Sequence, residues 1–143
     1  MKKGIILIIA IVIIIITSIT YLYLNYKTDM QIAQKENEQF ASYFNQEIYG
    51  PDLVTVMNKA MDNNAKNEIQ KDNKGHYIEN DTNSIKIEIR FLDSEVILLM
   101  EDLYRAGTSD FINYYNQIKF KCTKIKYHSN KKVKYMLFEQ ITQ

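Results

Sequence analysis

The amino-acid sequence predicts an α+β protein that carries a membrane anchor. Three features predict this class: one long uncharged apolar run, segments whose apolar residues recur at helical spacing, and segments in which apolar and polar residues alternate. The expected element order is α-α-β-β-α-α-β-β, with the four strands in one antiparallel sheet. The expected divisions are a cytoplasmic N-terminus over 1–4, a transmembrane helix over 5–24, a helical stalk over 25–49 and an extracytoplasmic α+β domain over 50–143.

The apolar run from Ile5 to Leu24 is 20 residues long and has no charged residue. A helix of this length rises about 30 Å, which is the thickness of the hydrocarbon core of a bilayer. In lipid the backbone can satisfy its polar groups only within a helix, so the many isoleucines do not prevent helix formation. We therefore expect Ile5 and Leu24 to bound a membrane anchor.

The charges around this run predict its orientation. Lys2 and Lys3 precede the run, whereas Lys27 is the one cation close behind it. The positive-inside bias then places the N-terminus in the cytoplasm and the rest of the chain outside. Two alternatives stay open: a signal peptide cleaved near Thr20, and the reversed orientation.

Two helices should follow the membrane run. Residues 25–49 are polar and become apolar on one face only near their end, which predicts a stalk that docks its last two turns on the domain. Gly50 and Pro51 should end this helix, and Pro51 suits the first turn of a second helix over about 51–66. The expected buried stripe of the second helix is Leu53, Val56, Met57, Ala60, Met61 and Ala65.

The clearest strand is Ser84–Leu92, in which isoleucines alternate with charged residues. We expect it to form a hairpin with His76–Asn80 across a turn-rich linker. Another hairpin should close the chain, formed by Lys119–Tyr127 and Val133–Ile141. Its alternation is imperfect and predicts a bulge near Thr123 and Lys124.

Two further helices are expected between these hairpins. Asp93 and Ser94 should cap the first, and Gly107 should stop it. Thr108 should begin a shorter helix that ends at about Gln117. The expected buried residues are Val96, Ile97, Met100, Leu103 and Tyr104 in the first helix and Phe111, Ile112, Tyr115 and Ile118 in the second.

Charge is divided unevenly along the chain. Residues 25–110 contain nine Lys or Arg against sixteen Asp or Glu, whereas 111–143 contain seven Lys against Glu139 alone. A basic, tyrosine-containing tail can contact an anionic polymer such as wall teichoic acid, lipid headgroups or nucleic acid. The simpler interpretation is that the lysines line the wet face and edge of the last hairpin, and a third is that they meet the acidic surface of a neighbouring copy. They are Lys119, Lys121, Lys124, Lys126, Lys131, Lys132 and Lys134.

The sequence offers little catalytic chemistry. It has no phosphate-binding glycine loop, nucleophile elbow or metal-ligand spacing. Cys122 should be a core residue, and His128 lies too far along the strand to pair with it unless the chain turns. We therefore expect no enzyme, no cofactor and no metal. The expected partners are the lipid bilayer and an envelope protein, an anionic polymer or a second copy, and nucleic acid is not our first choice.

Two resemblances add to this interpretation. The stretches 48–64 (IYGPDLVTVMNKAMDNN) and 120–128 (FKCTKIKYH) resemble a family of small signal-anchored bacterial membrane proteins that has no assigned activity. The layout is also similar to type IV pilins and pseudopilins, because Lys2-Lys3-Gly4 precedes an apolar helix that runs into an α+β head. Ile9 stands where that family carries a glutamate. These resemblances imply either a non-enzymatic anchored binding protein or, as the alternative, a pilin-like assembly subunit.

Overall fold

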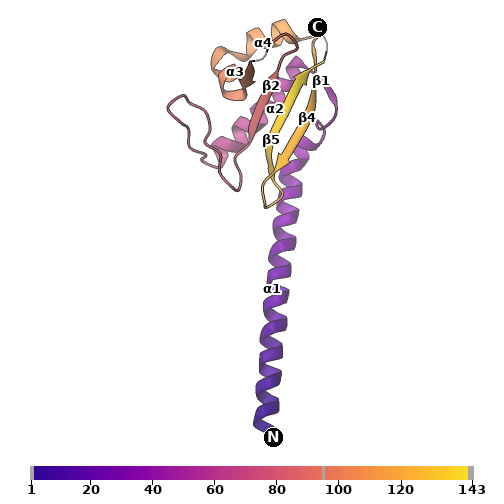
Figure 1. Cartoon of the computed structure of the whole chain (residues 1–143), viewed down its shortest axis with the longest axis vertical. Coiled ribbons are helices and arrows are strands. Elements are labelled where there is room, and N and C mark those ends of the chain that lie inside the picture. Colours follow the sequence, from indigo (N-terminus) through magenta and orange to yellow (C-terminus); the bar gives the residue numbers. More distant parts are fainter. Residues whose placement is uncertain (1, 95, 142–143) are drawn as a thin grey trace.

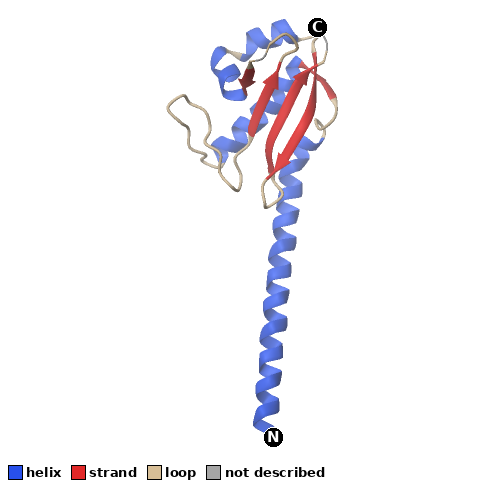
Figure 2. Ribbon diagram, in the orientation of Figure 1, coloured by secondary structure: helices blue, strands red, loops and turns tan. Residues whose placement is uncertain are grey.

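The computed structural model describes residues 2–94 and 96–141, and it shows an α+β head carried on one long helix (Figure 1). Met1, Thr142 and Gln143, which belong to the expected terminal divisions, lie outside the described residues. The long helix, α1 (Lys2–Ala41), contains 40 residues, and its N-terminal end points away from the head. Figure 2 shows the strands gathered at the opposite end, beside the last turns of α1.

The first part of α1 is fully exposed to its surroundings. Within the described residues, α1 is the one helix long and apolar enough to cross a membrane, and none of its most apolar stretch is buried by the protein. The hydroxyls of Thr17, Ser18 and Thr20 each donate to the carbonyl four residues earlier, over 2.8–2.9 Å. The helix therefore satisfies its own polar side chains, as a lipid environment requires.

The helix ends earlier than the sequence predicted. α1 stops at Ala41, and β1 (Glu47–Tyr49) occupies the end of the segment that we expected to be helical to residue 49. Ile48 is buried and lies opposite Phe120, so pairing in a sheet outweighs the helical spacing of this segment. The docked part of α1 is also longer than expected, because Ala33 is buried as well as Phe40.

The second helix, α2 (Gly50–Lys66), begins one residue before the predicted start at Pro51 and ends as predicted. Five residues of the expected stripe are buried, but Ala65 is exposed and Val54 is buried instead. Gly50 is required at the start of α2 because a Cβ atom there would collide with the backbone of Tyr115. Pro51 lies in the first turn of α2, as predicted, where its missing N–H leaves no hydrogen bond unmade.

The sheet has five strands and is mixed, not four-stranded and antiparallel as predicted. In addition to β1 it contains β2 (Lys86–Arg90), β3 (Ile97–Leu99), β4 (Lys119–Tyr127) and β5 (Val133–Gln140), in the order β1-β4-β5-β2-β3. β2 runs parallel to β5, and the other neighbours are antiparallel. The parallel pairing aligns the buried Ile87 and Ile89 of β2 with the buried Met136 and Phe138 of β5, so β2 lies between β5 and its neighbour in sequence, β3.

The predicted hairpin between His76–Asn80 and Ser84–Leu92 is wrong. The segment 76–80 is outside the sheet, and its one ladder contact is an isolated bridge between Lys71 and Tyr77. The side chain of Asn80 accepts hydrogen bonds from the backbone N–H groups of Thr82, Asn83 and Ser84. This side-chain-capped turn replaces the tight turn that a hairpin needs.

The predicted helix after Asp93 is only partly correct. Residues 97–99 form β3 at the sheet edge, and α3 (Met100–Ala106) begins after them. Met100 and Leu103 are buried as expected, whereas Val96 is 68% and Tyr104 58% exposed. Residues 97–99, just before Met100, pair with β2. The spacing of apolar residues in so short a segment fits a helix or a strand, so it did not predict this pairing. The next helix, α4 (Thr108–Tyr115), agrees with the prediction.

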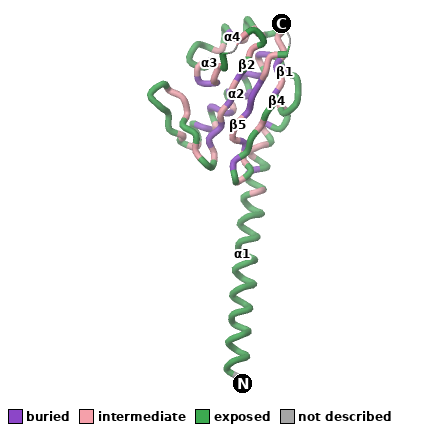
Figure 3. The backbone as a smooth tube through the Cα atoms, viewed as in Figure 1, coloured by how far each residue is buried: buried purple, intermediate pink, exposed green. Residues whose placement is uncertain are grey.

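The closing hairpin of β4 and β5 is confirmed, together with its bulge. The register shifts between Cys122 and Lys124, as the broken alternation predicted. Helix α2 and the last turns of α1 cover one face of the sheet, and Figure 3 shows the buried residues concentrated along that layer. The other face remains open to solvent and carries the charged side chains.

Asn64 is the polar centre of this core and generates a stability prediction. Its buried amide donates to the Ile85 carbonyl over 2.7 Å and accepts from the Ile85 N–H over 2.8 Å, which ties α2 to the start of β2. Replacing Asn64 by Ala should lower the free energy of unfolding by about 2–4 kcal/mol, because two buried backbone groups lose their partners. Urea unfolding of the full chain in detergent measures this, and the exposed Asn58→Ala on the same helix should be nearly neutral.

Candidate functional site

The junction between α1 and the turn that joins β4 to β5 determines how the head is held. We call this junction the neck and define it as residues 26–40 of α1 with residues 128–133. The side chain of Asn37 donates to the Lys131 carbonyl over 2.8 Å and accepts from the Val133 N–H over 2.9 Å. Lys132 Nζ lies 2.8 Å from Glu36 Oε2. The neck therefore joins helix and sheet through two side chains of α1.

The turn itself is well ordered by hydrogen bonds. The N–H of His128 donates to the Lys132 carbonyl over 2.8 Å, and the His128 carbonyl accepts from Lys131 over 3.0 Å. Lys131 takes a positive φ of 69°, which a tight turn of this kind needs. The buried ring of His128 bonds the Ser84 carbonyl through Nε2 over 2.8 Å. The turn is thus fixed to the loop before β2 as well as to α1.

A small cavity opens at the lower side of the neck. It has a volume of about 230 Å³, and it separates the tip of the turn from the helix. Its lining residues are Tyr26, Asp29 and Met30 from α1 and Ser129, Asn130 and Lys131 from the turn. Figure 1 shows the turn pointing along α1 towards the N-terminal end.

Sequence reasoning missed the neck entirely. Glu36 and Asn37 stand among other polar residues of a segment that looks like a solvated stalk, and no motif distinguishes them. The two backbone groups that Asn37 bonds lie 94 and 96 residues further along the chain. The one available signal was the apolar Ala33 and Phe40, which mark the face of α1 that docks.

Three of the seven predicted contact lysines are paired within the chain. Lys119 Nζ lies 3.0 Å from Glu47 Oε2, and Lys134 Nζ lies 3.5 Å from Glu79 Oε2. Lys132 is the neck residue bonded to Glu36. The hydrogen bond from the Lys119 ammonium to Glu47 raises the pKa of Lys119. These three lysines therefore serve the structure first.

The other four lysines have no ion pair within the part of the chain that the structure describes. Lys121 stands in register between two carboxylates, those of Glu47 on β1 and Glu139 on β5. Lys126 lies 5.2 Å from the centre of the Tyr135 ring, a cation–π distance. Lys124 and Lys131 are exposed. The unpaired positive charge is thus concentrated on the half of the hairpin nearer its turn.

A polar network covers the centre of the open face. Tyr135 donates its hydroxyl to Glu88 Oε2 over 2.7 Å, and Lys86 Nζ lies 3.0 Å from Glu88 Oε1. Burial and the neighbouring Glu88 carboxylate both raise the pKa of Tyr135. Burial alone would raise the pKa of Glu88, but hydrogen bonds from Tyr135 and Lys86 outweigh it and the pKa is lowered. This arrangement fits the interpretation of a wet, charged sheet face.

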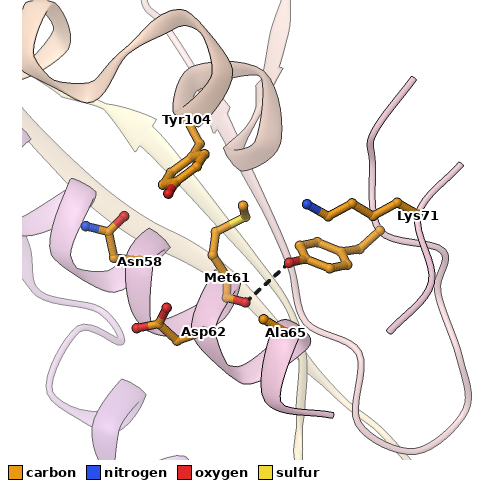
Figure 4. A pocket seen from close by; sticks show the side chains of 7 residues that line it. Asn58, Met61, Asp62, Ala65, Lys71 and Tyr104 are labelled. Atoms are coloured by element: carbon orange, nitrogen blue, oxygen red, sulfur yellow. Dashed lines mark hydrogen bonds between the residues drawn. The ribbon is translucent and has the colours of Figure 1, made fainter. Parts of the chain in front are cut away.

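A second depression lies between α2, α3 and the loop after α2 (Figure 4). It has a volume of about 400 Å³ and is lined by Asn58, Met61, Asp62, Ala65, Lys71, Tyr77 and Tyr104. The Tyr77 hydroxyl donates to the Met61 carbonyl over 3.5 Å, and the Lys71 ammonium lies 4.5 Å from the centre of the Tyr77 ring. Its polar side chains on α2 are exposed, so the depression presents no buried group of α2 aimed at a ligand.

Helix α3 holds the loop over 67–85 in place. His76 Nε2 lies 2.8 Å from Asp102 Oδ1, and the Tyr77 N–H donates to Glu101 Oε1 over 3.1 Å. Asp72 accepts the backbone N–H groups of His76 and Lys74, and the bond from His76 is the main cause of its lowered pKa. The residues next to His76 in the sequence do not identify Asp102 as its partner, because the position of α3 in the fold supplies it.

Cys122 and His128 have separate structural partners. The Cys122 thiol is buried and donates weakly to the Lys124 carbonyl over 3.6 Å, whereas His128 bonds Ser84. No group of three or more metal-ligating side chains converges among residues 2–94 and 96–141. The predicted core position of Cys122 is confirmed.

No protein-family model, curated protein or solved structure matches this chain. The two resemblances from the sequence therefore stay predictions.

The environment of Cys122 predicts low chemical reactivity. Its side chain is 1% exposed, and burial raises its pKa to about 11, so the reactive thiolate is scarce at neutral pH. At pH 8 the folded full-length protein should react slowly with iodoacetamide and react fully once unfolded in urea. A Ser129→Cys variant, with its new thiol on the exposed turn, should react rapidly under the same conditions. Equal rates for the two thiols would contradict the buried position.

Proposed function

We propose that this protein is a non-enzymatic, single-pass membrane protein with its N-terminus in the cytoplasm and its α+β head outside. The head, in this proposal, binds an anionic polymer of the cell envelope through the β4–β5 hairpin. The observation that carries the proposal is the combination of one exposed apolar helix with a hairpin on which four lysines lack an ion pair among the described residues.

The distribution of charge supports binding of a polymer with repeated negative charges. Lys124 and Lys126 flank Ile125 on β4, and the Lys126 ammonium lies over the ring of Tyr135 on β5. Alternating cations and aromatic rings can follow a flexible anionic chain without a deep pocket. The Cys122 thiol and the His128 ring bond different backbone carbonyls, those of Lys124 and Ser84. This arrangement supports a binding role over a catalytic thiol–imidazole pair.

Matched lysine variants test the polymer proposal. The triple variant Lys121→Gln, Lys124→Gln, Lys126→Gln should weaken binding of the full-length protein to polyphosphate. Because fewer counterions are then released, the slope of log affinity against log salt should become shallower by about 2 to 3. The charge-matched control Lys119→Gln, Lys132→Gln, Lys134→Gln should change the slope less, since those lysines are already paired. Equal effects of both triples, or binding that high salt leaves unchanged, would contradict the proposal.

A pilin-like assembly subunit is the second candidate. The unbroken α1, whose last turns pack on the head, favours it, because a stem helix of that kind can pack against copies of itself. Ile9 argues against it, since the glutamate of that family is missing.

One mass measurement distinguishes the two candidates and also determines the orientation in the membrane. Intact cells are treated with proteinase K, and the membrane-embedded peptide is extracted and weighed. Our proposal expects digestion of the head and a protected peptide that begins at Met1. A peptide that begins at Ile5 would instead support processing after Gly4 and the pilin-like candidate. A protected head in cells that lose it only after permeabilisation would show the reversed orientation.

A further inference from the structure

We infer that the tip of the β4–β5 turn rests against the lipid headgroups of the membrane that α1 spans, with Lys131 contacting headgroup phosphate. This inference rests on the proposed function, because it requires α1 to be a membrane anchor. It goes further by assigning a surface of the head, residues 127–131, to the bilayer itself. Of the four lysines without an ion pair among the described residues, Lys131 alone belongs to this surface. Lys121, Lys124 and Lys126 lie outside it on β4.

The length of helix between the apolar run and the neck supports this position. The cavity residues Tyr26, Asp29 and Met30 lie two to six residues beyond Leu24. With a rise of 1.5 Å per residue they stand about 3–9 Å beyond the hydrocarbon core. The headgroup layer on each side of a bilayer is about 5–8 Å thick. The turn residues that share the cavity with them therefore reach the level of the headgroups.

The neck prevents the head from swinging away from this position. Asn37 holds the backbone on both sides of Lys132, and Glu36 holds the Lys132 side chain. Ala33 and Phe40 are buried on the same stretch of helix. Because α1 continues without a break from the apolar run into this junction, any tilt of α1 carries the turn with it. A tilt of about 20°, which is typical of membrane helices, lowers the turn further when it leans to that side.

The chemistry of the tip suits a polar and aromatic interface. Tyr127 is 51% exposed, and Tyr26 stands exposed on the helix at the same end of the head. Tyrosine and lysine are favoured at the headgroup level because an apolar stem and a polar end suit the two sides of that boundary. Two carboxylates lie near the turn. Asp29 lines the same cavity, and Asp81 precedes Thr82, whose carbonyl accepts a hydrogen bond from Asn130 of the turn. Because their negative charges oppose that of an anionic lipid, we assign contact with the phosphate group itself and not a preference for anionic lipid.

Depth-dependent quenching tests this inference on the full-length protein. A Ser129→Cys variant is labelled with bimane at the turn, and Asn113→Cys is labelled on α4 at the far end of the head. Both are reconstituted in phosphatidylcholine vesicles that contain lipid spin-labelled at the headgroup. Either orientation in the vesicle gives the same measurement, because the head sits on its own leaflet. The unmodified chain, whose Cys122 is buried, measures background labelling.

We expect the label at Ser129→Cys to be quenched severalfold more than the label at Asn113→Cys. Equal, weak quenching at both positions in protein that floats with the vesicles would overturn the inference and leave the anchor intact. Protein that does not float with the vesicles would overturn both the anchor and the inference. These two failures are therefore distinguishable.

A charge-reversal pair tests the role of Lys131. Lys131→Glu in the Ser129→Cys background should reduce the quenching, because a carboxylate repels headgroup phosphate. Lys124→Glu is the matched control, since it makes the same charge change on the same hairpin, about 13 Å along β4 from the start of the turn. That distance exceeds the screening length of about 8 Å at physiological salt, so the control should leave the quenching unchanged. The same loss in both variants would contradict a local contact by Lys131.

Discussion

The hydrogen bonds of Asn37 are the constraint on which the rest of the arrangement depends. One amide side chain gives a donor to Lys131 and an acceptor to Val133, as the edge of a strand would, and so connects a helix to the end of a hairpin. Without the Asn37 bonds, the head would be held to α1 by the buried Phe40, by the bond from Lys59 to the Gln39 carbonyl and by the short turn over 42–46. With them, the helix and the hairpin form one body, and the position of α1 determines the position of the head.

In the folded chain, part of the basic tail forms ion pairs with the acidic part. The acidic first part supplies Glu36, Glu47 and Glu79, and each of them meets a lysine of the basic tail. Exposed ion pairs of this kind contribute little stability, but they remove charge that an external partner would otherwise meet. The lysines that have no ion pair among residues 2–94 and 96–141 lie mainly on the half of the hairpin nearer the neck. The position of a positive patch therefore follows from which lysines the fold has already used.

The neck also lies close to the apolar run of the same helix. α1 changes from apolar to polar after Leu24 without any change in its backbone, and its docked face begins at Ala33. The helix is exposed where we expect lipid and buried where the sheet covers it. A short distance between these two parts places the head close to the end of the apolar run, not at the top of a long free stalk.

The amino-acid sequence by itself determined the parts of this protein that depend on local patterns. They are the apolar helix, the start of α2 at Gly50 and Pro51, the β4–β5 hairpin with its bulge at Thr123, and the core position of Cys122. Periodicity and turn chemistry act between near neighbours, so they can be read from the chain.

Only the tertiary structure decided how β1, β2 and β3 pair and what holds the head. The parallel pairing of β2 with β5 depends on packing between segments about 50 residues apart, and β1 and β3 are too short to show a period of their own. The same limit applies to Asn37 and Glu36, because a polar side chain in a polar segment carries no sign of its distant partner. Contacts of this kind arise only when the folded core brings the two segments together.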